Sequence, residues 1–204
     1  MIVFIARLYK VGFNPTFFLL DQTNVSISRN QLAGYFLEAH LDKGSDPYNI
    51  ALWIDSDQSF DFNQFMKLLH HYDEEEEVDI LSARYITRDL TNPRVCAFNS
   101  VEDEEGIKFS AITPDNIGIV EVDSFGFGYV MMNPDVLEEM YSEYGLHQFC
   151  FRAEGNPLTG DILGEDMDWC IKAKKIGYKL YVDNDVSIGH VGGMIDDRIL
   201  GIVK

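Results

Sequence analysis

The stretch Asn49-Ile50-Ala51-Leu52-Trp53-Ile54-Asp55-Ser56-Asp57-Gln58-Ser59-Phe60 decides the fold that the sequence predicts. Its apolar run, 50–54, is too short for an independent helix and is typical of a strand buried on both faces of a mostly parallel sheet. Two carboxylates, Asp55 and Asp57, follow this strand. Side chains two residues apart in an extended chain leave on the same side, so this pair could share one divalent cation. The alternative is that Asp-Ser-Asp caps the next helix.

Apolar patterns on both sides of this stretch predict strands that alternate with helices. The predicted strands are 2–6, 25–27, 78–85, 118–122, 125–132 and 178–182, and the predicted helices are 16–22, 29–41, 61–72, 134–143 and 164–176. Such alternation is typical of an α/β protein with a mostly parallel central sheet and helices on both faces. Residues 87–118 contain two prolines and short apolar pieces, which predict a small antiparallel addition over the site.

The length and the charge narrow the class of protein. A chain of 204 residues predicts a single domain. The net charge of −18 opposes contact with phosphate backbones, so we expect no nucleic acid and no anionic membrane as partners. No run approaches the roughly 20 apolar residues of a membrane span. The odd number of widely spaced cysteines indicates reduced thiols, and we expect a cytoplasmic protein. The apolar end at 199–204 predicts either further domains of the same polypeptide or packing on a neighbour.

Two later features could join the carboxylates of the central stretch. Glu165 and Asp166 begin a predicted helix, where an acidic pair ordinarily acts as a cap and interacts with the helix dipole. From this position a fixed carboxylate could also face the same cleft and act as a general base toward a hydroxyl group. His190 follows a strand and has glycines close on both sides. A lone histidine is more often structural, but an imidazole with two carboxylates is an acceptable Mn²⁺ ligand set.

A glycine-rich strand forms the fourth feature. In Ser124-Phe125-Gly126-Phe127-Gly128 the glycines would permit a ligand to approach the backbone closely, and the phenylalanines could wall a sugar. A bulged strand without a ligand is the alternative interpretation.

In this order, the four features resemble the motifs of nucleotide-sugar glycosyltransferases of the GT-A fold. The matching segments are Ser28-Arg29-Asn30-Gln31-Leu32-Ala33, Trp53-Ile54-Asp55-Ser56-Asp57, Phe127-Gly128-Tyr129-Val130-Met131, Gly164-Glu165-Asp166 and His190. No single segment is strong evidence for the family, but the order and spacing of the five segments together are specific to it. Within this family the chain also resembles the N-terminal transferase domain of a large multidomain enzyme encoded by a chlorella virus, which would place it in the host cytoplasm.

The resemblance implies a Rossmann-like GT-A domain over residues 1–204 and a metal-dependent transfer. The donor would be a nucleoside-diphosphate sugar, with UDP as the usual nucleotide, and the acceptor a glycan or glycoprotein hydroxyl group. Asp57 and His190 would hold Mn²⁺ or Mg²⁺, and Asp55 would reach the cation through water or bind the donor's ribose. Such a cation stabilises the charge that develops on the leaving diphosphate.

The resemblance also assigns roles to residues outside the metal set. Asp166 would be the base that deprotonates the acceptor, with inversion at the sugar, and Glu165 would orient the acceptor. The implied nucleotide and donor contacts are Arg7, Arg29, Arg84, Asp21, Phe127 and Gly128. The segment before Ser28 is shorter than the family's strand, helix and strand unit, so either Asp21 would bind uracil from a changed geometry or the base would be held by other residues.

Two other classes of protein use carboxylates in this pattern. A phosphohydrolase of the haloacid dehalogenase type would use Asp55 as nucleophile, Asp57 as acid and Asp166 as metal ligand. That class requires Thr or Val at position 59, where the chain has Ser59, and a lysine before the late acidic pair, which the chain lacks between Lys108 and Lys172. A cation-dependent sugar-binding module would use the same carboxylates without a catalytic base.

Overall fold

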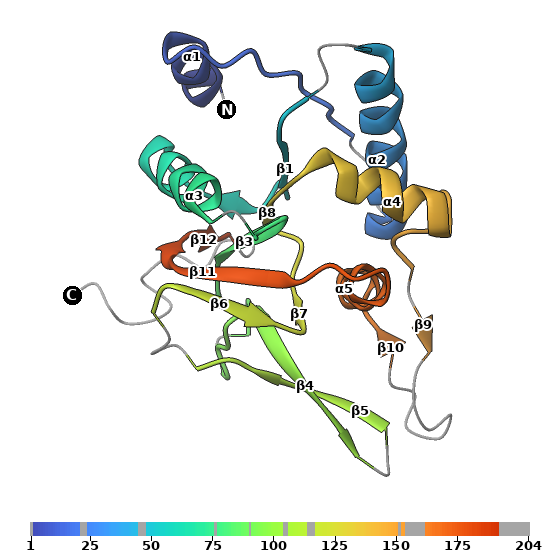
Figure 1. The fold of residues 1–204 in the computed structure, drawn as a ribbon. Coiled ribbons are helices and arrows are strands. Elements are labelled where there is room, and N and C mark those ends of the chain that lie inside the picture. Colours follow the sequence, from blue (N-terminus) through green and yellow to red (C-terminus); the bar gives the residue numbers. More distant parts are fainter. Residues whose placement is uncertain are drawn as a thin grey trace, which may run out of the picture.

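A computed structural model describes residues 2–20, 24–44, 48–75, 77–89, 91–103, 106–113, 117–150, 152–153 and 162–191. Its centre is a mixed sheet that, within these residues, has the strand order β1-β8-β3-β11-β6 (Figure 1). The bounds are β1 (Ala51–Ile54), β8 (Tyr129–Met132), β3 (Ile80–Arg84), β11 (Leu180–Ser187) and β6 (Ile119–Val122).

The strand directions contradict the predicted mostly parallel, Rossmann-like GT-A sheet. β3 and β11 pair in parallel, whereas β1 with β8, β8 with β3, and β11 with β6 are antiparallel. The reason is that β8 inserts between β1 and β3 and runs against both. β1 is therefore an edge strand of the described sheet and is half-buried along its length, not fully buried on both faces as its apolar run predicted.

Among the described residues, three smaller sheets lie around the main sheet. Their strands are β2 (Gln58–Ser59) with β12 (Gly189–His190), β4 (Ala97–Asp103) with β5 (Gly106–Ala111) and β7 (Ser124–Phe125), and β9 (Arg152–Ala153) with β10 (Ile162–Leu163). Figure 1 shows the β4–β5 hairpin, in green, extending away from the main sheet. The β2–β12 ladder matters most for the site, because it joins the chain directly after β1 to the end of the described chain.

Helices cover both faces of the sheet. The bounds are α1 (Ile2–Lys10), α2 (Val25–Asp42), α3 (Phe62–Glu74), α4 (Pro134–Tyr144) and α5 (Glu165–Lys175). One buried cluster joins α2, α4 and α5 to one face, and the other joins α1 and α3 to the opposite face. Strand residues alternate between the two clusters: Ile80 belongs to the first and Leu81 to the second. No helix in the described part of the chain has the length and apolar character needed to cross a membrane.

Several local predictions are confirmed, and for α3 and α4 a capping residue explains why. α3 begins after Asp61, whose side chain accepts from the backbone of Gln64 in a capping box. α4 begins with Pro134 at its first position after the Asn133 cap. The helix predicted from Gly164 is α5.

Three predictions at the N-terminal end are wrong. Residues 2–6 were predicted as a strand and belong to α1. Phe4 and Leu8 are one helical turn apart, and both pack in the cluster around Phe65. The predicted strand 25–27 is the first turn of α2, which Asn24 caps by accepting from the backbone N–H of Ile27 at 3.1 Å. Residues 16–20, predicted as helix, have no regular secondary structure.

Candidate functional site

Asp57 and His190 lie side by side because β2 pairs with β12. In this antiparallel ladder His190 is opposite Gln58, and the backbone N–H of Val191 donates to the carbonyl of Asp57 at 2.7 Å. Nε2 of His190 consequently lies 3.6 Å from Oδ2 of Asp57. The fold thus brings together the two residues predicted as metal ligands, although 133 positions separate them.

Arg88 lies between these two side chains. Its Nη2 forms an ion pair with Oδ2 of Asp57, and its Nε donates to Nε2 of His190 at 2.8 Å. The other ring nitrogen, Nδ1, is 2.9 Å from the carbonyl oxygen of Ile86. A carbonyl can only accept, so Nδ1 carries the proton and Nε2 presents its lone pair. This tautomer is the one in which His190 can ligate a cation through Nε2.

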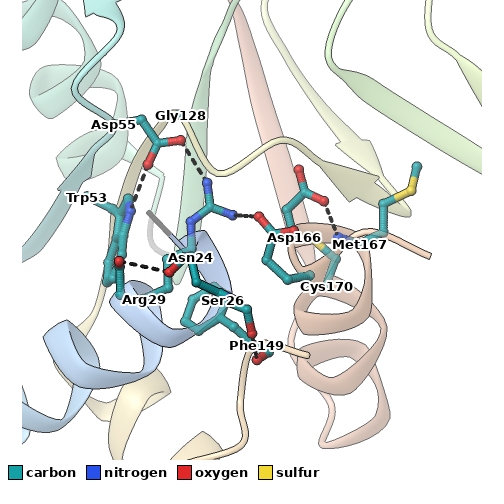
Figure 2. Close-up of polar contacts among 12 residues, drawn as sticks. Asn24, Ser26, Arg29, Trp53, Asp55, Gly128, Phe149, Asp166, Met167 and Cys170 are labelled. Atoms are coloured by element: carbon teal, nitrogen blue, oxygen red, sulfur yellow. Dashed lines mark hydrogen bonds and ion pairs between the residues drawn. The ribbon is translucent and has the colours of Figure 1, made fainter. Parts of the chain in front are cut away.

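Asp55 belongs to a separate, more buried group around Arg29. Arg29 is 4% exposed, and its guanidinium donates to Oδ2 of Asp55 at 2.7 Å and to Oε1 of Glu165 at 2.6 Å. Figure 2 shows Arg29 between Asp55 and the start of α5. The indole N–H of Trp53 lies 3.4 Å from the other oxygen of Asp55. Both oxygens of Asp55 are therefore engaged.

The two aspartates do not share a partner, in contrast to the prediction from an extended chain. Ser56 and Asp57 form a turn, closed by the backbone N–H of Gln58 donating to the carbonyl of Asp55 at 3.2 Å. The turn directs Asp55 toward Arg29 and Asp57 toward Arg88. Strand pleating, which places alternate side chains on one side, ends with β1 at Ile54.

The start of α5 places Asp166 next to the Arg29 group. Oδ1 of Asp166 accepts from the backbone N–H of Met167 at 2.8 Å (Figure 2). Burial raises the pKa of the Asp166 carboxyl above its ordinary value, Arg29 partly offsets this increase, and Asp55 adds to it. The pKa of Glu165 is raised by burial in the same way, again with Arg29 as the main opposing charge. A raised pKa is suitable for a general base working near neutral pH.

The glycines at 126 and 128 accommodate Tyr85, which the sequence did not single out. A Cβ on Gly126 would collide with the Tyr85 hydroxyl, and a Cβ on Gly128 would lie 2.9 Å from its Cζ. The backbone N–H of Gly128 donates to that hydroxyl at 3.1 Å. The predicted close approach at these glycines is thus made by a side chain of the protein. The ring of Tyr85 also packs edge-on against His190, with centroids 5.2 Å apart.

The remaining predicted site residues belong to several different elements of the fold. Phe127 is fully buried, and the guanidinium carbon of Arg29 lies 5.4 Å from its ring centroid. Its ring therefore packs against Arg29 and does not line an open pocket. Arg84 ends β3 next to Ser187 of β11. Arg7 is on α1, 5.7 Å from the ring of Phe62 at the start of α3. Asp21 lies outside the described residues.

Asp57 and His190 hold two cation-ligating atoms close together. Oδ1 of Asp57 is buried and has no hydrogen-bond partner among the described residues, and Oδ2 is 3.6 Å from the Nε2 lone pair of His190. Two bonds of about 2.1 Å span up to about 4.2 Å, so one cation can reach both atoms. The described ranges contain no metal-binding group of three or more His, Cys, Asp and Glu side chains. One carboxylate oxygen and one imidazole nitrogen are donor types that a divalent cation such as Mn²⁺ accepts, and phosphate oxygens and water would complete its shell.

Sequence reasoning missed two members of the site, Arg88 and Tyr85. Nothing in the local pattern marks Arg88, because its partners come from distant segments. Tyr85 had a signal that could have been used. It continues the alternation of Leu81 and Ala83 on one face of β3, and the alternate glycines 126 and 128 leave space for a large ring.

Comparison with known proteins identifies a shared fold. No protein-family model matches the sequence, and no curated protein matches it. Solved structures do match, among them the crystal structure of A197 from STIV, with a TM-score of 0.53 and 16% sequence identity. That match covers 95% of this chain and 88% of that chain. At this identity the likeness concerns the fold alone.

Proposed function

We propose that this protein is a metal-dependent glycosyltransferase that moves a sugar from a nucleoside-diphosphate sugar, UDP-linked, to an acceptor hydroxyl group. We further propose inversion at the transferred sugar and a role in the synthesis of a glycan or glycoprotein. One observation supports this proposal: a single turn separates Asp55 and Asp57 into two neighbouring groups. Asp57 lies beside His190, whereas Asp55 joins Arg29 and Glu165, and Asp166 is next to this second group.

The Asp57–His190 pair and the Asp55 carboxylate would have different roles in binding the donor. Asp57 and His190 would hold Mn²⁺ or Mg²⁺, and the bound cation would neutralise charge on the leaving diphosphate. Asp55 has a fixed orientation, because Arg29 and Trp53 engage both of its oxygens, and it is suited to accept a hydrogen bond from the donor's ribose.

Asp166 is the residue best suited to remove the proton of the acceptor hydroxyl. Its pKa is raised by burial, and its Oδ1 is held by the N–H of Met167. Gly164 leaves room for this arrangement, because a Cβ there would lie 2.8 Å from Oδ1 of Asp166. Glu165, bound to Arg29, would fix the start of α5 beside the acceptor.

The alternative phosphohydrolase requires Asp55 as a free nucleophile. That role fits poorly with a carboxylate whose two oxygens contact Arg29 and the indole of Trp53. The sugar-binding module needs no base, so it differs from the transferase only in turnover.

The test is release of UDP from a panel of UDP-sugars in Mn²⁺ and in EDTA, with the wild-type chain and Asp166→Asn. A transferase hydrolyses or transfers its donor slowly in Mn²⁺ and not in EDTA, and Asp166→Asn binds UDP but does not transfer. Normal turnover by Asp166→Asn would reject Asp166 as base. Cleavage of simple phosphomonoesters would favour the phosphohydrolase, and metal-dependent binding without turnover would favour the module.

A further inference from the structure

The guanidinium of Arg88 occupies the position at which a cation would bind Asp57 and His190. It forms an ion pair with Oδ2 of Asp57 and donates from Nε to Nε2 of His190 at 2.8 Å. These two atoms are also the ones that a divalent cation would use. A single side chain of the protein thus already supplies the positive charge between the two ligands.

Arg88 and a divalent cation cannot hold this position together. Arg88 occupies Oδ2 of Asp57 and the one lone pair on Nε2 of His190, and only Oδ1 of Asp57 is left without a partner among the described residues. Two positive charges a few ångströms apart also repel each other strongly in a partly buried site. Binding of a metal ion therefore requires the guanidinium to leave. Breaking the Arg88 contacts makes the free energy of metal binding less favourable, so the observed affinity for the metal is lower.

The position of Arg88 in the chain allows this movement. Its side chain is 51% exposed, so it can swing into solvent without opening the core. Its backbone is held by neighbours: Ile86 forms a bridge to Val95, and the N–H of Thr87 donates to the carbonyl of Arg94 at 2.8 Å. A displaced guanidinium would consequently remain within a side chain's length of the site. A diphosphate that entered with the metal would present the anionic oxygens that arginine binds well.

We propose that Arg88 competes with the metal ion for Asp57 and His190. When metal and nucleotide bind together, Arg88 leaves these two residues and binds the diphosphate instead. This inference rests on the proposed function and adds an order of events to it. Metal alone binds weakly, because Arg88 opposes it. Metal with a diphosphate binds well, because the nucleotide provides a new partner for Arg88.

The two halves of the proposal predict effects of opposite sign in Arg88→Ala. Titration calorimetry should show that Mn²⁺ alone binds Arg88→Ala about tenfold more tightly than it binds the wild-type chain. UDP at saturating Mn²⁺ should bind the same variant about tenfold more weakly. Arg88→Lys keeps the charge but cannot contact both ligands at once, so its Mn²⁺ affinity should lie between the two. Arg94→Ala removes the same charge from the same segment and should change neither affinity.

The outcomes separate this inference from the proposed function. Equal or weaker Mn²⁺ binding by Arg88→Ala would overturn the competition, and the proposed function would stand if UDP binding still required both Mn²⁺ and Asp57. Tighter Mn²⁺ binding with unchanged UDP affinity would overturn the exchange onto the diphosphate. If neither the wild-type chain nor Arg88→Ala bound Mn²⁺, and UDP bound equally in EDTA, the inference and the proposed function would both fail.

Discussion

Nη1 of Arg29 donates to Oε1 of Glu165 at 2.6 Å, across 136 positions of sequence. The same guanidinium donates to Asp55, so one buried cation links α2, the end of β1 and the start of α5. Rings of Phe127 and Phe149 lie 5.4 and 5.8 Å from its central carbon. The geometry of the candidate site therefore depends on this arginine as much as on the carboxylates.

We expect Arg29→Met to destabilise the protein by about 3 kcal/mol, because it leaves the buried Glu165 and the partly exposed Asp55 without their cation. Urea denaturation at neutral pH measures this loss. The double variant Arg29→Met/Glu165→Gln should recover part of it, since the buried charge is then removed as well. A loss below about 0.5 kcal/mol, or no recovery in the double variant, would contradict the assigned contacts.

Asp166→Asn should be more stable than the wild-type chain at neutral pH. The folded-state pKa of Asp166 is raised by burial, so the native state holds its proton more tightly than the unfolded state. Stability is therefore lost as the pH rises from the ordinary aspartate pKa through the raised one, and the asparagine avoids this loss. Thermal unfolding at a series of pH values measures the difference, which should vanish below the ordinary aspartate pKa.

Asp89→Asn is the matched control with the opposite sign. Hydrogen bonds from Thr91 lower the pKa of Asp89 in the folded state. Its contribution to stability is present above the ordinary aspartate pKa and is lost as the pH falls through the lowered one, so Asp89→Asn should be slightly less stable at neutral pH. The same sign for both variants would contradict the environment assigned to Asp166.

The raised pKa of Asp166 also predicts the pH dependence of turnover. A general base must be deprotonated, so kcat should fall as the pH decreases through the pKa of Asp166 in the complex. This fall in kcat should occur at a pH above the ordinary pKa of aspartate, because burial, which raises the pKa, is the largest influence on Asp166. A profile of kcat against pH at saturating Mn²⁺ measures it, and a flat profile down to the ordinary aspartate pKa would argue against Asp166.

Gly126→Ala should destabilise the wild-type chain by about 1–3 kcal/mol, because the new Cβ would overlap the hydroxyl of Tyr85. In a Tyr85→Phe background the overlapping oxygen is gone, so the same substitution should cost less. Tyr85→Phe itself should cost about 1–3 kcal/mol, since the buried N–H of Gly128 loses its acceptor. Denaturant unfolding of the four chains gives the coupling, and additive effects would contradict the packing.

Local elements of this fold could be predicted from the sequence, whereas the sheet directions could not. Helices α3 and α4 begin at side-chain caps, and α3, α4 and α5 all have residue patterns that are visible in a short window. The antiparallel insertion of β8 between β1 and β3 depends on pairing between segments far apart in the chain. The apolar run at residues 2–6 was wrongly predicted as a strand for the same reason, because its packing against α3 decides that it is a helix.

The candidate site shows the same division. Carboxylates and a histidine are recognisable by residue type, and the β2–β12 ladder brings Asp57 to His190 as the proposed role requires. The turn at Ser56, which separates Asp55 from Asp57, begins directly after β1 and has no clear sequence signal. Arg88 was missed because a single arginine after a strand is common, and only its long-range contacts make it distinctive.

The central claim is that Asp57 and His190 form a cation site that holds a nucleoside diphosphate. Calorimetric titration of UDP into the wild-type chain, Asp57→Asn and the surface control Glu121→Gln, each in Mn²⁺ and in EDTA, tests it most directly. The account predicts that Mn²⁺ strengthens UDP binding by at least about tenfold in the wild-type chain and in Glu121→Gln, and that Asp57→Asn loses this gain. Equal binding of UDP by Asp57→Asn and the wild-type chain, with or without Mn²⁺, would contradict the account.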